Sequence, residues 1–218
     1  MVFIVFEGGE SVGKSTQIEL LFRVLNQAGI NCIKTREPGG TPFAESIRAL
    51  FKQEVRTDAP VPFAELMLVL AARAQHLQNF IYPKLKCNNT LILCDRFMDS
   101  TYVYQHFLAG LSKQTIDVIS QFILDSFLPD LTFVFSLEAE QAVARMKQNR
   151  LLSGDRFDHQ ELSFHKKVMQ SYQFLCESQF AYPCGRVPRR VFIDASLSQE
   201  EVFGQIAGYV KHYLGISI

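Results

Sequence analysis

Short β-rich apolar runs alternate with longer amphipathic segments along the chain. This alternation is typical of an α/β fold, in which a mostly parallel sheet is crossed by helices. The short runs predict strands over Val2–Phe6, Asn31–Thr35, Thr90–Cys94, Leu131–Leu137 and Val191–Asp194.

The longer segments predict helices between these strands. The first helix is the best marked, because Ile18, Leu21, Phe22 and Leu25 follow the i, i+3, i+4, i+7 spacing of one buried face, and Gly29 ends it. Further helices are predicted over Pro42–Lys52, Pro62–Lys86, Lys113–Ser126, Ala139–Asn149, Glu161–Ser178 and Ser198–Tyr213. The polar stretch Gln148–Gln160 lies between two of them and predicts a mobile loop.

Length and charge narrow the range of functions. The 218 residues fit one domain over 1–218, large enough to bury a sheet under helices on both sides. Lys plus Arg number 22 and Asp plus Glu also 22, so there is no overall field to hold a nucleic acid or an anionic membrane. Any phosphate binding must therefore be local.

Cysteine usage and the N-terminus favour a cytoplasmic protein. The five cysteines are scattered and show no C-x-x-C spacing, which predicts reduced thiols without a metal or redox role. The opening run Val2–Phe6 is too short to span a bilayer, and no basic leader precedes it.

A phosphate-binding motif follows the first predicted strand. The eight residues after Glu7 match G-x-x-x-x-G-K-[ST] and lead directly into the first predicted helix: Gly8, Gly9, Glu10, Ser11, Val12, Gly13, Lys14 and Ser15. Glycines let backbone N–H groups surround phosphate oxygens, and the helix N-terminus favours the same anion. Lys14 should reach the β- and γ-phosphates and Ser15 a bound Mg²⁺. The alternative is a glycine-rich turn with an incidental lysine.

Two further strands end in charged residues. Asp95 and Arg96 follow the third strand, at the carboxyl edge where open parallel sheets bind ligands. Asp95 can hold Mg²⁺ or its water, and Arg96 can clamp a phosphate with two parallel N–H bonds. The alternative for Asp95 is a structural ion pair with another arginine.

Arg36 ends the second strand, and Pro38 with two glycines turns the chain after it, so a second anion clamp is expected at the same edge. Arg73 lies on an apolar helix face, where a charge usually has a partner, although a surface arginine with a buried stem is the alternative.

Taken together, the motifs resemble those of the thymidylate kinase family over nearly the whole chain. They are Phe6 through Thr16, Thr35-Arg36-Glu37-Pro38-Gly39-Gly40-Thr41, Asp95-Arg96-Phe97 with Ser100 and Tyr104-Gln105, and Asp155-Arg156-Phe157. The resemblance implies a P-loop kinase core with a five-stranded parallel sheet, helices on both faces and a mobile lid, usually as a homodimer. It also implies transfer of the γ-phosphoryl group of ATP to dTMP with Mg²⁺.

The resemblance further implies roles for individual residues. Arg36, Arg73 and Arg96 would surround the acceptor phosphate, Gln105 would bind the thymine edge, and Tyr104 would select deoxyribose. The other residues implied for the acceptor are Glu10, Phe63, Val69, Ser100 and Thr101. The family usually has an aromatic ring where this chain has Val69, and Phe63 or Phe97 could supply one instead.

On the donor side, Thr16 would join the P-loop in ATP binding, and Arg145 would cover the adenine. The P-loop contains no base at Glu10-Ser11-Val12, so Arg150 or Arg156 of the lid would act as the catalytic arginine, as in a lid-arginine group common among bacterial enzymes. The alternatives are another nucleoside monophosphate kinase, with a different or broader base preference, and a non-catalytic ATP-binding switch module.

Overall fold

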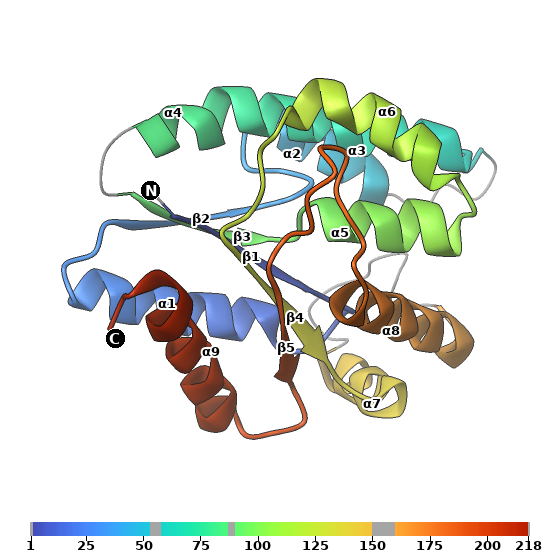
Figure 1. The fold of residues 1–218 in the computed structure, drawn as a ribbon. Helices are drawn as coiled ribbons and strands as arrows, with labels where there is room; N and C mark the ends of the chain where they lie inside the picture. The colour runs from blue at the N-terminus through green and yellow to red at the C-terminus, as the bar shows by residue number, and fades with distance from the viewer. Residues whose placement is uncertain (1, 53–57, 87–89, 150–159, 218) are drawn as a thin grey trace.

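The computed structural model describes residues 2–52, 58–86, 90–149 and 160–217. Within them, five parallel strands form one sheet in the order β2-β3-β1-β4-β5, with helices on both faces (Figure 1). The strands are β1 (Val2–Gly8), β2 (Cys32–Arg36), β3 (Leu91–Asp95), β4 (Leu131–Ser136) and β5 (Arg190–Asp194). The predicted α/β class is confirmed, and the strand bounds agree to within one or two residues.

Different sets of helices cover the two faces of this sheet. One face carries α1 (Lys14–Gln27) and α9 (Gln199–Leu214). Elements packed against the other face include α3 (Pro62–His76), α6 (Lys113–Leu124) and α8 (Leu162–Glu177). Outside these, α2 (Pro42–Lys52) packs on α3, and α7 (Ala139–Asn149) packs on α8.

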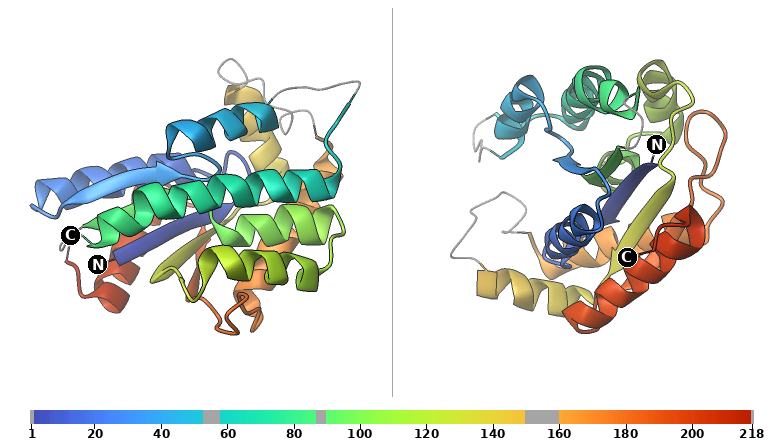
Figure 2. Two further views of the ribbon diagram at one scale, coloured as in Figure 1. Left: turned by 90° about the horizontal axis from the view of Figure 1, so that it is seen from above. Right: turned by 90° about the vertical axis from the view of Figure 1, so that its left-hand side faces the viewer.

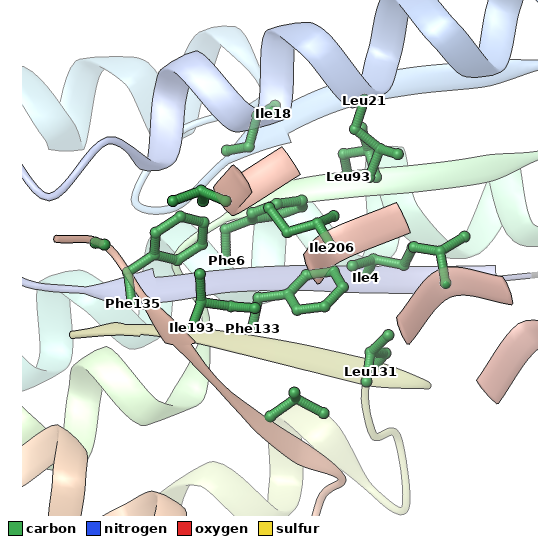
Figure 3. Close-up of a cluster of buried hydrophobic side chains, with 14 of the residues drawn as sticks. Ile4, Phe6, Ile18, Leu21, Leu93, Leu131, Phe133, Phe135, Ile193 and Ile206 are labelled. Carbon is green, nitrogen blue, oxygen red and sulfur yellow. The ribbon is translucent and has the colours of Figure 1, made fainter. Parts of the chain in front are cut away.

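Alternation along the strands explains the two layers. Ile4 and Phe6 of β1 point into the cluster formed with α1 and α9, where Leu21 and Ile206 also lie (Figure 3). Phe3 and Val5 point the other way, into the cluster formed with α3, α6 and α8. Since both faces of a parallel sheet are buried, its strands read as continuous apolar runs.

The predicted helix Pro62–Lys86 is one continuous rod made of three segments. After α3, the π-helical segment η1 (Leu77–Ile81) leads into α4 (Tyr82–Lys86), and Figure 2 shows the rod lying across the sheet. A second helical stretch was absent from the sequence prediction. It comprises α5 (Met98–Thr101) and the π-helical η2 (Tyr102–Leu108), directly after β3.

The strand register determines where the charged residues lie. Asp95 pairs with Phe6 of β1 on one side and with Arg36 of β2 on the other. The carboxyl ends of β1, β2 and β3 are therefore level. The chain leaves β1 on the α1 face and leaves β3 on the opposite face, so a crevice opens between these neighbouring strands, the usual ligand site of such sheets.

Candidate active site

Glycines shape the loop between β1 and α1. Gly8 has φ 139°, and a Cβ there would stand 2.7 Å from the carbonyl oxygen of Phe135 on β4. Gly13, with φ 94°, is the residue that precedes α1, which begins at Lys14. Because both conformations favour glycine, the loop can curve back over the helix N-terminus and direct its N–H groups toward an anion.

Lys14 lies inside this loop, with only 6% of its surface exposed. Its Nζ donates to the carbonyl oxygens of Gly8 (3.1 Å) and Gly9 (2.5 Å). Burial, and then the charge of Arg96, lower the pKa of Lys14, while Asp95 and Glu10 act in the opposite direction. The ammonium group is thus held beside the cradle by neutral oxygens.

Arg96 follows β3 and faces the loop across the crevice. Its φ of 70° turns the chain back toward β1, where its backbone N–H donates to the carbonyl oxygen of Phe6 at 2.9 Å. Nη1 donates to the carbonyl oxygen of Gly8 at 3.0 Å, and Nη2 donates to Glu10 Oε1 at 2.5 Å. Burial alone would lower the pKa of Arg96, but Glu10 and other neighbours raise it well above its usual range, so the residue stays a cation.

Ser15 and Asp95 meet at the same end of the crevice. Ser15 Oγ lies 3.5 Å from Asp95 Oδ2, and the buried Asp95 Oδ1 has no hydrogen-bond partner in the part of the chain that the structure describes. A buried carboxylate oxygen without a partner is costly unless a ligand satisfies it. These two residues therefore fit a hard cation such as Mg²⁺.

A cleft of about 720 Å³ joins these groups. The P-loop residues Glu10 to Thr16 line one end, and Asp95, Arg96 and Arg73 line its middle. The remaining predicted residues that line the cleft are Val69, Ser100, Thr101, Tyr104 and Gln105. The cleft thus brings the P-loop together with the charged residues that follow β3.

Comparison with known proteins identifies the family of this chain. The family model described as thymidylate kinase matches residues 6–206. The thymidylate kinase of Trichlorobacter lovleyi is 38% identical over 221 residues, covering all of both chains. That of Acinetobacter baylyi is 40% identical and covers 96% of this chain and 98% of its own.

A solved thymidylate kinase, from Ehrlichia chaffeensis, superposes with a TM-score of 0.72 at 26% identity, covering 96% of this chain and 98% of that one. The chain belongs to the thymidylate kinase family. It is an ATP-dependent kinase that phosphorylates dTMP to dTDP. The matches do not favour a kinase for another monophosphate or a non-catalytic switch module.

The T-R-E-P-G-G-T block of this thymidylate kinase family member forms a buried polar network. Glu37 Oε2 accepts from Arg73 Nε at 2.6 Å, and Glu37 Oε1 lies 3.0 Å from His76 Nδ1. A Cβ on Gly40 would stand 2.3 Å from His76 Nε2, so a larger residue there would displace the ring. The block therefore ties β2 to α3 below the cleft.

The three predicted acceptor arginines lie in different environments. Arg73 is 2% exposed and donates to Thr101 Oγ1 and to the carbonyl oxygen of Phe97, each at 2.9 Å. Arg36 is about half exposed, pairs with Glu45 at 2.8 Å and lines a smaller neighbouring depression rather than the main cleft. Of the three, Arg96 is the one that contacts the P-loop, through Gly8 and Glu10.

Other predicted residues lie partly or wholly outside the cleft. Phe63 is 48% exposed and is not among the described residues that line it. Arg145 donates to the carbonyl oxygen of Ala195, just beyond β5. Arg150 and Arg156 lie outside the described residues, as does most of the predicted lid over residues 148–160.

Residues of this site that were not predicted from the sequence include Arg48, Phe51, Glu7 and Tyr172. Arg48 on α2 lines the cleft and donates to the carbonyl oxygen of Pro38 at 3.1 Å. Glu7 is fully buried behind Arg96, and Tyr172 of α8 reaches both residues. Helical spacing could have placed Arg48 one turn from Glu45, but no local signal brings Tyr172 to β1.

None of the helices that the structure describes combines the length and the hydrophobicity needed to cross a lipid bilayer.

Proposed function

We propose that the cleft binds both substrates of the reaction, with the triphosphate of ATP on the P-loop and the phosphate of dTMP beside Arg96. One observation carries this assignment. Lys14 of the P-loop and the guanidinium group of Arg96 line one cleft at the carboxyl edge of the sheet, and both donate to the carbonyl oxygen of Gly8. Two phosphates held there would face each other for direct transfer.

The protein's part in the transfer is positioning and charge neutralisation. A dTMP phosphate oxygen attacks the γ-phosphorus of ATP, the bond to the β-phosphate oxygen breaks, and ADP leaves. No general base is needed, because the attacking phosphate is already ionised. Lys14 and Arg96 stabilise the negative charge on the transferring group, as fixed cations in a water-poor cleft do.

Arg48 is a second candidate cation for the acceptor phosphate. It lines the cleft, and its guanidinium group donates to the neutral carbonyl oxygen of Pro38. Burial, and then the nearby Arg36, lower the pKa of Arg48. The negative charge of a bound dTMP phosphate would favour the charged form of Arg48 and so offset both effects. Arg36 could join it by leaving Glu45, because an exposed pair contributes at most about 1 kcal/mol.

Arg73 suits a neutral group of the acceptor better than its phosphate. The carboxylate of Glu37 neutralises its charge, and three of its nitrogens already donate within the protein. We therefore assign Arg73 to the base end of the cleft with Val69, Gln105 and Phe51, which all line it. Phe51 provides a ring among the described residues that line the cleft, whereas Phe63 of α3 does not line it.

Mg²⁺ is the metal we assign to the reaction, held by Ser15 and Asp95. When bound, it would bridge phosphate oxygens and neutralise their charge. In the described residues no group of three or more His, Cys, Asp or Glu side chains could hold a metal by itself. This fits an ion that takes most of its ligands from phosphate and water, as Mg²⁺ does.

The active form is proposed to be a homodimer. Exposed apolar side chains lie on α2, α3 and α6, which form one outer layer (Figure 2), and they include Phe43 (58% exposed), Met67 (44%), Val118 (57%) and Phe122 (87%). Exposed apolar side chains gathered on one layer favour a protein interface there. Phe122→Asp should shift the sedimentation coefficient to that of a monomer, whereas an unchanged value would exclude Phe122 from the interface.

A cytoplasmic location, the absence of nucleic acid and membrane partners, a single domain over 1–218 and a lid arginine remain predictions from the sequence.

An assay of acceptor specificity tests the proposal. The purified chain with Mg²⁺ and ATP would be supplied with dTMP, dUMP, dCMP, AMP and GMP in parallel, and ADP release would be followed. We expect the highest kcat/KM with dTMP. Equal or faster turnover of another monophosphate would contradict the assignment of the base end.

A further inference from the structure

Glu7, near the end of β1, is a fully buried carboxylate, and it does not line the cleft. Its Oε1 accepts from the backbone N–H groups of Phe97 (2.7 Å) and Ser100 (3.2 Å). Its Oε2 accepts from two hydroxyls, Ser100 Oγ at 2.6 Å and Tyr172 OH at 3.0 Å. One oxygen thus holds the start of α5, and the other holds two side-chain hydroxyls.

The same two hydroxyls accept hydrogen bonds from Arg96. Nη1 of Arg96 lies 3.2 Å from Ser100 Oγ and 3.1 Å from Tyr172 OH. A hydroxyl has one hydrogen and two lone pairs. Both hydroxyls lie within hydrogen-bonding distance of Glu7 Oε2, and their oxygens are 2.8 Å apart. A hydroxyl that donates to Glu7 turns its lone pairs toward the guanidinium group, so Glu7 favours the orientation in which the hydroxyls accept from Arg96.

These contacts fix the guanidinium plane. Nη1 has oxygens of Gly8, Ser100 and Tyr172 around it, and Nη2 has Glu10. The ring of Tyr104 also lies near this plane, with its centroid 5.5 Å from the guanidinium carbon. A guanidinium group whose plane is fixed can present its N–H groups to a phosphate in one orientation.

We propose that Glu7 and Tyr172 are positioning residues for the acceptor, acting through Arg96. They hold its guanidinium plane in the orientation that meets the phosphate of dTMP. This inference rests on the proposed role of Arg96 as a phosphate ligand. It makes the acceptor site depend on α8, which the sequence analysis did not connect with dTMP.

The first test removes one hydroxyl. Tyr172→Phe should raise the KM for dTMP about fivefold, the effect of losing one hydrogen bond of ordinary strength, with the KM for ATP unchanged. Tyr102→Phe is a matched control, because its buried hydroxyl also donates to a carboxylate, Asp117 Oδ1 at 2.7 Å, without contacting Arg96. Both variants should lose similar stability, but only Tyr172→Phe should change the KM for dTMP.

The second test changes Glu7 itself. Glu7→Gln keeps an oxygen for the two backbone N–H groups but replaces Oε2 with an NH₂ donor, so the hydroxyl hydrogens must turn away. We expect a larger increase in the KM for dTMP than in Tyr172→Phe. If Glu7→Gln does not fold, the tyrosine variants still decide the question.

The variant Arg96→Ala tests the phosphate-binding role of Arg96 separately from the positioning role of Glu7 and Tyr172. It should raise the KM for dTMP about tenfold or more, and adding Tyr172→Phe should then have no further effect, since coupled residues are not additive. An unchanged KM in Arg96→Ala would overturn the role of Arg96 itself. A normal KM in Tyr172→Phe, or an equal additional effect without Arg96, would overturn the positioning role alone.

Discussion

Replacing Glu37 with glutamine should destabilise the fold far more than its single-atom change suggests. Glu37 and Arg73 are 3% and 2% exposed, and their ion pair spans 2.6 Å. Without the carboxylate, the guanidinium of Arg73 would stay buried with only neutral partners at Thr101 and Phe97. The single amide oxygen of glutamine could accept from Arg73 or from His76 but would not replace both carboxylate oxygens.

The size of this destabilisation follows from the burial of the Arg73–Glu37 ion pair. Removing one partner of a buried ion pair costs about 3–5 kcal/mol, because the other charge is left uncompensated. For a chain of this size that corresponds to a decrease in Tm of about 6–20 °C. Glu45→Gln is the matched control, since it breaks the Arg36–Glu45 pair, whose side chains are 52% and 38% exposed. That loss should be at most about 1 kcal/mol.

Urea denaturation followed by circular dichroism at neutral pH measures the free energy of unfolding of both variants. Equal destabilisation by Glu37→Gln and Glu45→Gln would refute the reasoning. The pH dependence gives a second check. Burial alone would raise the pKa of Glu37, but Arg73 and His76 outweigh it and lower the pKa below 4.5.

A lowered pKa means that the stabilisation by Glu37 is present above pH 4.5 and is lost as the pH falls through the folded value. The stability gap between wild type and Glu37→Gln should therefore be constant at neutral pH and narrow in acid. A gap that widened below pH 4.5 would contradict the assigned charge state.

Three further predictions concern the cleft. Lys14→Ala should lower kcat about 10²–10³-fold in a protein that stays folded, because it removes a cation from the transferring phosphate; a normal kcat would remove Lys14 from the mechanism. Asp95→Asn should raise the Mg²⁺ concentration for half-maximal rate about tenfold at saturating dTMP, and an unchanged Mg²⁺ dependence would exclude Asp95 from the metal site. Arg48→Ala should raise the KM for dTMP about ten- to a hundredfold. The control Arg23→Ala changes a side chain that is 65% exposed on α1 and should leave the KM unchanged. Equal KM values in the two variants would exclude Arg48 from the acceptor site.

Much of the fold could be predicted because local and global signals agree. The apolar runs of β1, β3 and β4 correspond to strands buried on both faces, whereas the edge strands β2 and β5 alternate between buried and more exposed residues. Gly29 ends the first helix as expected, with φ 77°. The helical stretch from Met98 to Leu108 was not predicted, because Tyr102, Val103 and Tyr104 favour strands locally. Tertiary packing decides their conformation, since Tyr102 and Val103 are fully buried.

The site was predictable where function depends on consecutive residues. The P-loop and Asp95-Arg96 are local motifs at strand ends, and the sheet register brings them together. Partners distant in sequence were not predictable. Tyr172 lies 165 residues from Glu7, and the pairing of Arg73 with Glu37 rather than with an open site depends on how α3 packs on β2.

A crystal structure with dTMP and a non-hydrolysable ATP analogue tests the central claim most directly. The account predicts that the dTMP phosphate lies within hydrogen-bonding distance of Arg96 and faces the γ-phosphate analogue held by Lys14 and the loop amides. A dTMP molecule bound outside this cleft, or with its phosphate turned away from the loop, would contradict it.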